Sequence, residues 1–216
     1  MNDEKSTALT IASALLQINA IKLNVKNPYT WVSGIKSPIY CDNRRTLSYP
    51  DIRNMIADGI VTCIRREFPD CDVIAGVATG AIAHGMLVAD RMNKPFIYVR
   101  SSAKEHGLAN RIEGNISPGS AVVVVEDLVS TGKSSLNAVK ALKQAGCNVL
   151  GMVAIFSYEM PEANDGMKQE NCPLYTLSNF SALIRQAQDE KIIASDEVEV
   201  LSAWRKNPEK YYYDKI

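Results

Sequence analysis

The sequence has no excess of charge of either sign, since its 216 residues include 24 Lys plus Arg and 24 Asp plus Glu. Nucleic acids and anionic membranes are bound through an excess of positive charge, so neither is expected as a partner. The chain also lacks an internal repeat, a low-complexity segment, a signal peptide and a membrane-spanning run. We predict a single soluble domain spanning residues 1–216, long enough to bury a substantial core.

Cysteine is scarce and irregularly placed. The five cysteines are Cys41, Cys63, Cys71, Cys147 and Cys172. Their number is odd and no two form a CxxC pair, so we expect neither a disulfide framework nor a zinc site. Free thiols fit a reducing compartment, and we predict a cytoplasmic protein.

The stretch 119–146 combines a buried strand with an amphipathic helix. Four consecutive valines at 122–125 do not alternate with polar residues, which is typical of a strand covered on both faces of a parallel sheet. Apolar residues then recur at helical spacing up to a glycine stop at Gly146. The loop between strand and helix, 126–135, would lie at the carboxyl end of a strand, where open α/β sheets bind ligands.

This loop has two chemically different halves. Its second half presents hydroxyls and closely spaced N–H groups at a helix N-terminus, which favours a phosphate. Its first half holds Glu126 and Asp127, which would repel a bare phosphate by about 4 kcal/mol per close pair at intermediate dielectric. The conflict disappears if the acids contact sugar hydroxyls, a divalent cation or both. We infer a ribose phosphate as the ligand, with an ordinary βα turn as the alternative.

The Gly-Lys-Ser triplet at 132–134 also invites interpretation as a nucleotide-triphosphate P-loop. That motif needs a glycine five positions before its Gly-Lys pair, so that the backbone can wrap the β-phosphate. Asp127 occupies this position, and its carboxylate is wrong in shape and in charge. We therefore reject the P-loop interpretation.

Outside this stretch the patterns predict an α/β fold, with a central, mainly parallel sheet flanked by helices. The expected helices cover 6–21, a segment from Tyr49 to about Ile64, 179–188 and 195–205, and the expected strands cover 72–77, 96–99, 149–156 and 175–177. Residues 28–44 read as a hairpin around a Ser-Gly turn. The segment after Ser157 reads as a polar loop.

Two further loops follow predicted strands. The small residues of 78–85 can offer N–H groups to a second phosphate, although a tight βα turn explains them equally well. We interpret His84 there as a packing residue rather than a catalyst. The segment 100–114 is polar, cationic and bounded by glycine, which is typical of a mobile loop. A solvated charge run is the alternative, but the position before the phosphate strand would let its cations close on a polyanion.

Together these segments resemble the orotate phosphoribosyltransferases, type I phosphoribosyltransferases that use phosphoribosyl pyrophosphate (PRPP). The resemblance covers nearly the whole chain. It rests on SGIKSPIYCDNR from Ser33, GVATG from Gly76, the spacing of Arg100, Lys104 and His106, and EDLVSTGKS from Glu126. The last motif indicates only the wider PRPP-using group. The first narrows it to orotate, because in this family the N-terminal hood covers the base.

The resemblance implies a type I phosphoribosyltransferase fold with a hood at about 1–45, a mobile loop at about 100–114 and a PRPP loop at 126–134. The implied reaction transfers the 5-phosphoribosyl group from PRPP to orotate, which gives orotidine 5′-monophosphate and pyrophosphate in pyrimidine biosynthesis. Mg²⁺ is the implied cofactor, bound mainly through PRPP, with no protein ligand assigned. A homodimer is also implied, in which the mobile loop acts across the interface.

Residue by residue, the resemblance assigns catalytic roles to Arg100, Lys104, His106 and Asp127. It assigns PRPP binding to Arg100, Lys104, His106, Glu126, Asp127, Leu128, Val129, Ser130, Thr131, Gly132, Lys133 and Ser134. It assigns orotate contacts to Ser130 and Lys36. Within the PRPP loop, the two acids would hold the ribose diol and residues 130–134 the 5-phosphate.

The chain departs from the family at two places. Many members carry a basic residue directly after the loop arginine, where this chain has Ser101, and some carry a lysine in the pyrophosphate loop, where 79–81 has none. Charge neutralisation would then depend more on Mg²⁺, Arg100 and Lys104. Two other classes stay open: a phosphoribosyltransferase for another base, which should differ within 29–44, and a PRPP-sensing regulator, which should show a basic surface or an added DNA-binding unit.

Overall fold

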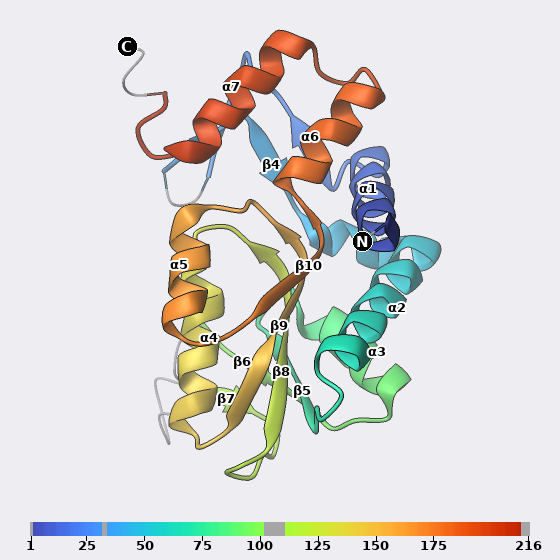
Figure 1. Ribbon diagram of the computed structural model, residues 1–216, viewed down its shortest axis with the longest axis vertical. Coiled ribbons are helices and arrows are strands. Elements are labelled where there is room, and N and C mark those ends of the chain that lie inside the picture. Colours follow the sequence, from blue (N-terminus) through green and yellow to red (C-terminus); the bar gives the residue numbers. More distant parts are fainter. Residues whose placement is uncertain (1, 32–33, 102–110, 213–216) are drawn as a thin grey trace.

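The computed structural model describes residues 2–31, 34–101 and 111–212, and a six-stranded sheet lies at its centre (Figure 1). The strand order is β10-β9-β8-β5-β6-β7. The strands are β5 (Val73–Val77), β6 (Phe96–Val99), β7 (Ile112–Glu113), β8 (Ala121–Val129), β9 (Asn148–Ser157) and β10 (Leu174–Asn179). All neighbours are parallel except β6 and β7. The predicted α/β class with a mainly parallel sheet is confirmed.

Helices cover both faces of this sheet (Figure 1). One side carries α1 (Asn2–Gln17), α2 (Pro50–Glu67) and α3 (Ile82–Met92), and the other carries α4 (Lys133–Gln144) and α5 (Pro161–Gln169). The valines at 122–125 are all 0% exposed, which explains why no polar residue alternates with them. In the part of the chain that the structure describes, no helix has the length and apolar character needed to span a bilayer.

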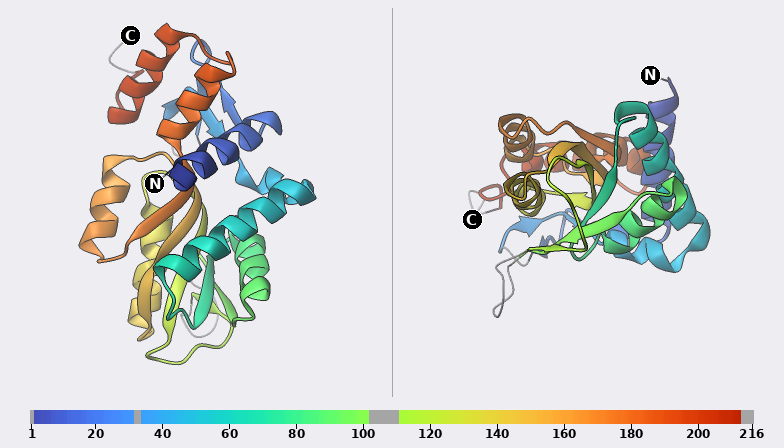
Figure 2. Two further views of the ribbon diagram at one scale, coloured as in Figure 1. Left: turned by 45° about the vertical axis from the view of Figure 1, so that its right-hand side comes forward. Right: turned by 90° about the horizontal axis from the view of Figure 1, so that it is seen from below.

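The N-terminal segment forms the hood, which consists of two small antiparallel sheets and lies at the carboxyl ends of the parallel strands (Figure 1). In one sheet β1 (Ile21–Leu23) pairs with β4 (Ile39–Cys41), and in the other β2 (Tyr29–Thr30) pairs with β3 (Lys36–Ser37). A 3-10 helix, η1 (Asn43–Ser48), follows. Figure 2 shows that α6 (Phe180–Asp189) and α7 (Ser195–Lys206) lie at the same end of the molecule.

Two helix predictions need correction. The first helix was expected to reach residue 21 but ends at Gln17, because Asn19 has a positive φ of 56° and turns the chain into β1. The polar loop expected after Ser157 contains α5, which Pro161 begins at a position where its missing N–H costs no hydrogen bond.

Two strand predictions also need correction. The acids Glu126 and Asp127 were expected in a loop but lie on β8, which keeps its pairing with β9 as far as Val129. The segment 100–114 was expected to be loop throughout, yet Ile112 and Glu113 form β7 and pair with β6. In both cases the deciding contact comes from a neighbouring strand and leaves no local signal in the sequence. The predicted hairpin at 28–44 is confirmed for β2 and β3, while its continuation pairs with β1.

Candidate active site

The two carboxylates near the end of β8 have different surroundings. Glu126 is only 3% exposed; its Oε2 accepts a hydrogen bond from Ser135 Oγ at 2.8 Å, and its Oε1 accepts one from the Asp127 N–H at 3.0 Å. Burial, followed by the charge of Asp127, raises the pKa of Glu126 well above its usual value. Asp127, the next residue on β8, is only half-buried.

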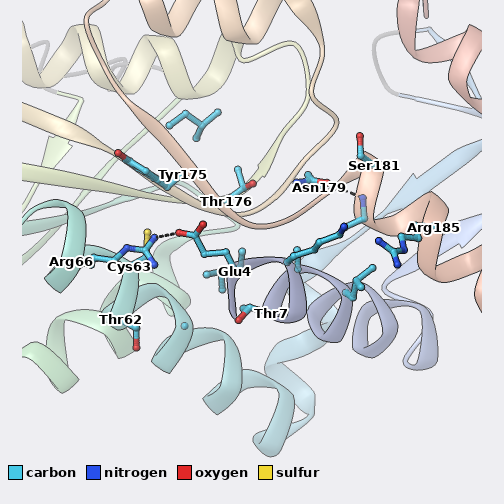
Figure 3. Close-up of a pocket in the computed structure, with 17 residues that line it drawn as sticks. Glu4, Thr7, Thr62, Cys63, Arg66, Tyr175, Thr176, Asn179, Ser181 and Arg185 are labelled. Atoms are coloured by element: carbon cyan, nitrogen blue, oxygen red, sulfur yellow. Dashed lines mark hydrogen bonds and ion pairs between the residues drawn. The ribbon is translucent and has the colours of Figure 1, made fainter. Parts of the chain in front are cut away.

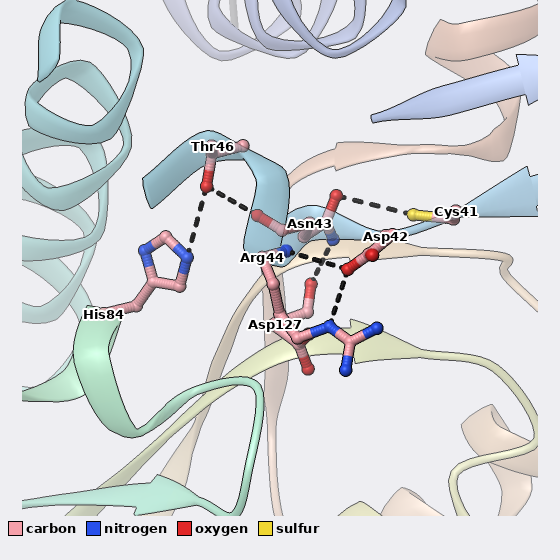
Figure 4. A network of polar contacts seen from close by, with 7 residues as sticks. All are labelled: Cys41, Asp42, Asn43, Arg44, Thr46, His84 and Asp127. Carbon is pink, nitrogen blue, oxygen red and sulfur yellow. Dashed lines mark hydrogen bonds and ion pairs between the residues drawn. The ribbon is translucent and has the colours of Figure 1, made fainter. Parts of the chain in front are cut away.

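Asp127 joins the strand to two distant segments (Figure 4). A Cβ at Gly80, in the turn after β5, would collide with the Asp127 carboxylate, so only glycine permits this approach. From the hood, the buried Asn43 donates its Nδ2 to the Asp127 carbonyl at 2.6 Å, while the Cys41 thiol contacts Asn43 Oδ1 at 3.4 Å. The segments that carry the GVATG and SGIKSPIYCDNR motifs therefore meet at one residue, the first at the carboxylate of Asp127 and the second at its carbonyl.

The N-terminus of α4 is open toward a cavity of about 370 Å³. Gly132 precedes the helix with a positive φ of 80°, and no side chain caps the first turn, so its N–H groups are available to an anion. The cavity is lined by Ser101, Arg111, Leu128, Ser130, Thr131, Gly132, Lys133, Ser134, Ser135 and Asn137. Of the PRPP-loop residues predicted here, Val129 instead lies wholly in the core.

The turn of the hood faces the same loop. Ile35 shares a second cavity, of about 400 Å³, with Thr131 and Lys133. Beside it, Lys36 donates its Nζ to Thr30 Oγ1 at 2.6 Å, and its carbonyl accepts a hydrogen bond from Trp204 Nε1 of α7 at 2.9 Å. The predicted orotate residue thus lies next to the predicted phosphate loop, held there by a helix from the other end of the chain.

Only part of the predicted cationic loop lies within the described residues. Lys104 and His106 lie outside the described residues. Arg100, at the end of β6, forms an ion pair with Glu113 at 3.4 Å and does not line the phosphate cavity. Arg111 does line it, donating Nη2 to the Ser101 carbonyl at 2.6 Å and Nε to the Arg100 carbonyl at 3.1 Å.

His84 has the surroundings of a packing residue. It is 0% exposed, and its Nε2 lies 3.3 Å from Thr46 Oγ1 (Figure 4). Its Nδ1 has no hydrogen-bond partner among the residues described. Burial lowers the pKa of His84, which favours the neutral ring in this position between α3 and η1.

Several residues of the site escaped the sequence reasoning. Asn43 bonds Asp127, which is 84 positions away in the sequence, and Trp204 bonds Lys36, which is 168 positions away. No local pattern reveals contacts over such separations. Gly80 was noticed only as part of a small-residue loop. Arg111 was part of the cationic segment, but no role was assigned to it.

A larger cavity, of about 800 Å³, lies between α1, α2, β10 and α6 (Figure 3). Its lining includes none of the predicted site residues. One of the cations that line it, Arg66, is paired with Glu4 at 2.6 Å (Figure 3) and with Glu67 at 2.6 Å. We therefore place the functional site at the carboxyl ends of the strands. Among residues 2–31, 34–101 and 111–212, no group of three or more His, Cys, Asp and Glu side chains could hold a metal ion.

Comparisons with known proteins identify the family of the chain. The model of the phosphoribosyl transferase domain family matches residues 49–184. The orotate phosphoribosyltransferase of Porphyromonas gingivalis is 50% identical over 207 residues, 96% of this chain and 99% of the relative; that of Bacillus cytotoxicus is 52% identical over 92% of this chain and 94% of the relative. UMP synthase of Leishmania donovani has a TM-score of 0.77 at 26% identity, over 93% of this chain and 42% of that one. The chain therefore belongs to the orotate phosphoribosyltransferase family.

Proposed function

We propose that this protein transfers the 5-phosphoribosyl group from PRPP to orotate, giving orotidine 5′-monophosphate and pyrophosphate. One observation carries the proposal. Near the end of β8 the N-terminus of α4 is uncapped, the half-buried Asp127 contacts the hood through Asn43, and Ile35, which precedes Lys36, shares a cavity with Thr131 and Lys133. A phosphate, a ribose diol and an anionic base each find a matching group there.

In this proposal the loop 130–134 binds the 5-phosphate and Asp127 accepts hydrogen bonds from the ribose diol. Glu126 is buried and accepts hydrogen bonds from Ser135 and from the Asp127 N–H. It thereby holds the backbone that carries Asp127. Lys36 and Ser130 contact orotate, whose ring nitrogen forms the new bond to the ribose. The proximity of Ile35 to Thr131 and Lys133 in one cavity supports placing base and phosphate on either side of the sugar.

Breaking the bond from ribose C1 to pyrophosphate leaves positive charge on the sugar and negative charge on the leaving group. Arg100, Lys104 and His106 are proposed to stabilise the departing anion, each well-placed donor contributing roughly 3 to 4 kcal/mol. The geometry of Lys104 and His106 stays a prediction. The described Arg100 would have to leave Glu113 to reach the anion, a rearrangement of one surface ion pair that costs about 1 kcal/mol or less.

Mg²⁺ is proposed as the cofactor, shared between PRPP and the protein. The donor chemistry fits, because Asp127 is a half-buried carboxylate beside the phosphate cavity, whereas both Glu126 oxygens are already bonded within the protein. When bound, the ion would neutralise pyrophosphate oxygens. Asp127 would then hold the sugar in register with the phosphate loop.

We further propose a homodimer working in the cytoplasm, with the loop 100–114 acting on the partner's site. All five cysteines are free and four of them are buried, which fits a reducing compartment. The Arg100–Glu113 pair holds the start of this loop beside β7, so its described ends are anchored on the edge of the sheet.

A panel of bases tests the proposed function. The purified protein is mixed with PRPP and Mg²⁺, and loss of orotate absorbance is compared with turnover of adenine, hypoxanthine and uracil. We expect orotate alone to be consumed, with one pyrophosphate released per orotate. Turnover of a purine without orotate would assign the chain to another base, and binding of PRPP without any turnover would favour a regulator.

A further inference from the structure

Ser101 and Arg111 line the phosphate cavity together with the loop 130–134, and we call this pair its cationic wall. We propose that Arg111 binds the 5-phosphate of PRPP from this wall, an inference that rests on the proposed function and adds a substrate-binding residue to it. Arg111 and Lys133 are the two cations that line the cavity within the described part of the chain. A phosphate monoester carries up to two negative charges at neutral pH, so a single lysine on the loop leaves it incompletely neutralised.

The position of the Arg111 guanidinium is fixed by the backbone. Its Nη2 donates to the Ser101 carbonyl and its Nε to the Arg100 carbonyl, which leaves further N–H donors of its planar fork for a ligand. Both partners are neutral, and none of the ion pairs formed among the described residues involves Arg111. The full positive charge therefore remains available in the cavity.

The contact with the Ser101 carbonyl places the charge of Arg111 beside residue 101. The chain has no basic side chain at residue 101, directly after Arg100. Ser101 and Arg111 line the same wall and are joined by a 2.6 Å hydrogen bond. Because β6 and β7 run antiparallel and bring the two ends of the loop together, a cation at its far end can serve the site that residue 101 borders.

The ligand group follows from the other residues that line the cavity. They include the uncapped first turn of α4 with the hydroxyls of Ser130, Thr131 and Ser134, a site for a terminal phosphate. Asp127 does not line this cavity, so the diol and the pyrophosphate beyond it lie farther along the substrate. We therefore assign Arg111 to the 5-phosphate rather than to the leaving group.

The test compares Arg111→Gln with the matched control Arg65→Gln, which removes an exposed arginine from α2. Calorimetry measures binding of ribose 5-phosphate, orotidine 5′-monophosphate and pyrophosphate to each protein. We expect Arg111→Gln to weaken the first two about ten-fold, the size of one lost charged hydrogen bond, and to leave pyrophosphate unchanged. The control should bind all three like the parent. Unchanged binding of ribose 5-phosphate, or a loss confined to pyrophosphate, would overturn the assignment.

A second variant separates charge from architecture, since Arg111→Gln also loses two contacts to backbone carbonyls. Adding Ser101→Lys to Arg111→Gln returns a cation to the same wall, and we expect it to recover most of the affinity for ribose 5-phosphate. A persistent loss in a protein with the parent's melting temperature would mean that Arg111 acts only through the backbone. Orotate turnover by the parent protein tests the proposed function separately, because it does not depend on either variant.

Discussion

Glu126 and Asp127 are neighbours in sequence, yet burial separates their properties. An unfolded glutamate ionises near pH 4.3, whereas burial beside Asp127 raises the folded pKa of Glu126. Between these two values the folded protein retains a proton that the unfolded chain has lost. Stability should therefore fall as pH rises through that window, which begins near pH 4.3 and ends at the raised folded pKa.

We predict that Glu126→Gln stabilises the protein at pH 8 and has little effect at pH 4. The gain should appear only above the pKa of an unfolded glutamate, because there the buried Glu126 either keeps a proton that the unfolded chain has lost or ionises at a cost, whereas a glutamine is uncharged in both states. Urea unfolding at the two pH values measures it. The exposed Glu199→Gln on α7 is the control and should show no such pH dependence. A variant less stable than the parent at pH 8 would show that Glu126 is ionised and stabilising.

Gly80 tests whether the turn after β5 sets the position of Asp127. Gly80→Ala places a methyl group where the carboxylate lies, so we expect kcat/KM for PRPP to fall at least about 100-fold, as happens when a reacting group is displaced by about 1 Å. Steady-state kinetics checks this. Gly119→Ala is the control: it meets open space but has a positive φ of 85°, so it should cost stability without changing kcat/KM. Equal kinetic effects would remove Gly80 from the site.

Among the secondary-structure elements, the hood and α7 are joined by a hydrogen bond and by aromatic packing. Trp204 is fully buried, its indole N–H binds the carbonyl of Lys36, and its ring packs edge-on against Trp31 at 5.7 Å and against Tyr158 at 6.0 Å. The C-terminal helix thereby holds the strand that carries the proposed orotate lysine. Packing of this kind contributes about 0.5 to 1.5 kcal/mol per aromatic pair.

Trp204→Phe should keep most of the packing and lose the hydrogen bond to Lys36. We expect a stability loss of about 1 to 2 kcal/mol and a KM for orotate raised several-fold, with the KM for PRPP nearly unchanged, because β3 would be less firmly held. Thermal unfolding and initial rates measure the two effects. Tyr175→Phe, on β10 and remote from the hood, is the control. Equal changes in both KM values would show that α7 does not act through the orotate side.

At the scale of the whole molecule, the proposed dimer makes a specific prediction. Lys104→Ala should lower kcat far more than it weakens PRPP binding, because the lysine acts on charge that develops in the transition state. Asp127→Asn should be nearly inactive for lack of the diol contact. If the loop acts across the interface, dimers mixed at random from the two variants should recover roughly a quarter of parental activity.

Coexpression of the two differently tagged variants, followed by assay of the mixture, gives that measurement. A mixed dimer holds one site with an intact Asp127 and the partner's intact loop, whereas neither unmixed dimer holds such a site. The separately purified variants are the controls. Activity no higher than theirs would mean that each loop serves its own subunit.

The sequence alone determined the central unit and its ligand class. The valine run 122–125 has no polar face to turn toward water, so it had to be buried, and a hydroxyl-rich helix start after two acids suits a ribose phosphate. Strand ends were less predictable, because β8 reaches Val129 only through its pairing with β9. The short α5 lacks a strong apolar pattern, and packing rather than periodicity defines it.

What only the tertiary structure decided is which groups share the site. Gly80 and Asn43 reach Asp127, Trp204 reaches Lys36, and Arg111 reaches the phosphate cavity across distances that no local pattern encodes. The two acids of the opening motif were alike in sequence, but in the folded chain Glu126 is buried against Ser135, whereas Asp127 is only half-buried and lies beside Gly80. The sequence therefore shows which chemical groups are available. The burial of each group, which shifts its pKa, and its neighbours in space are decided only when the strands pair and the chain packs.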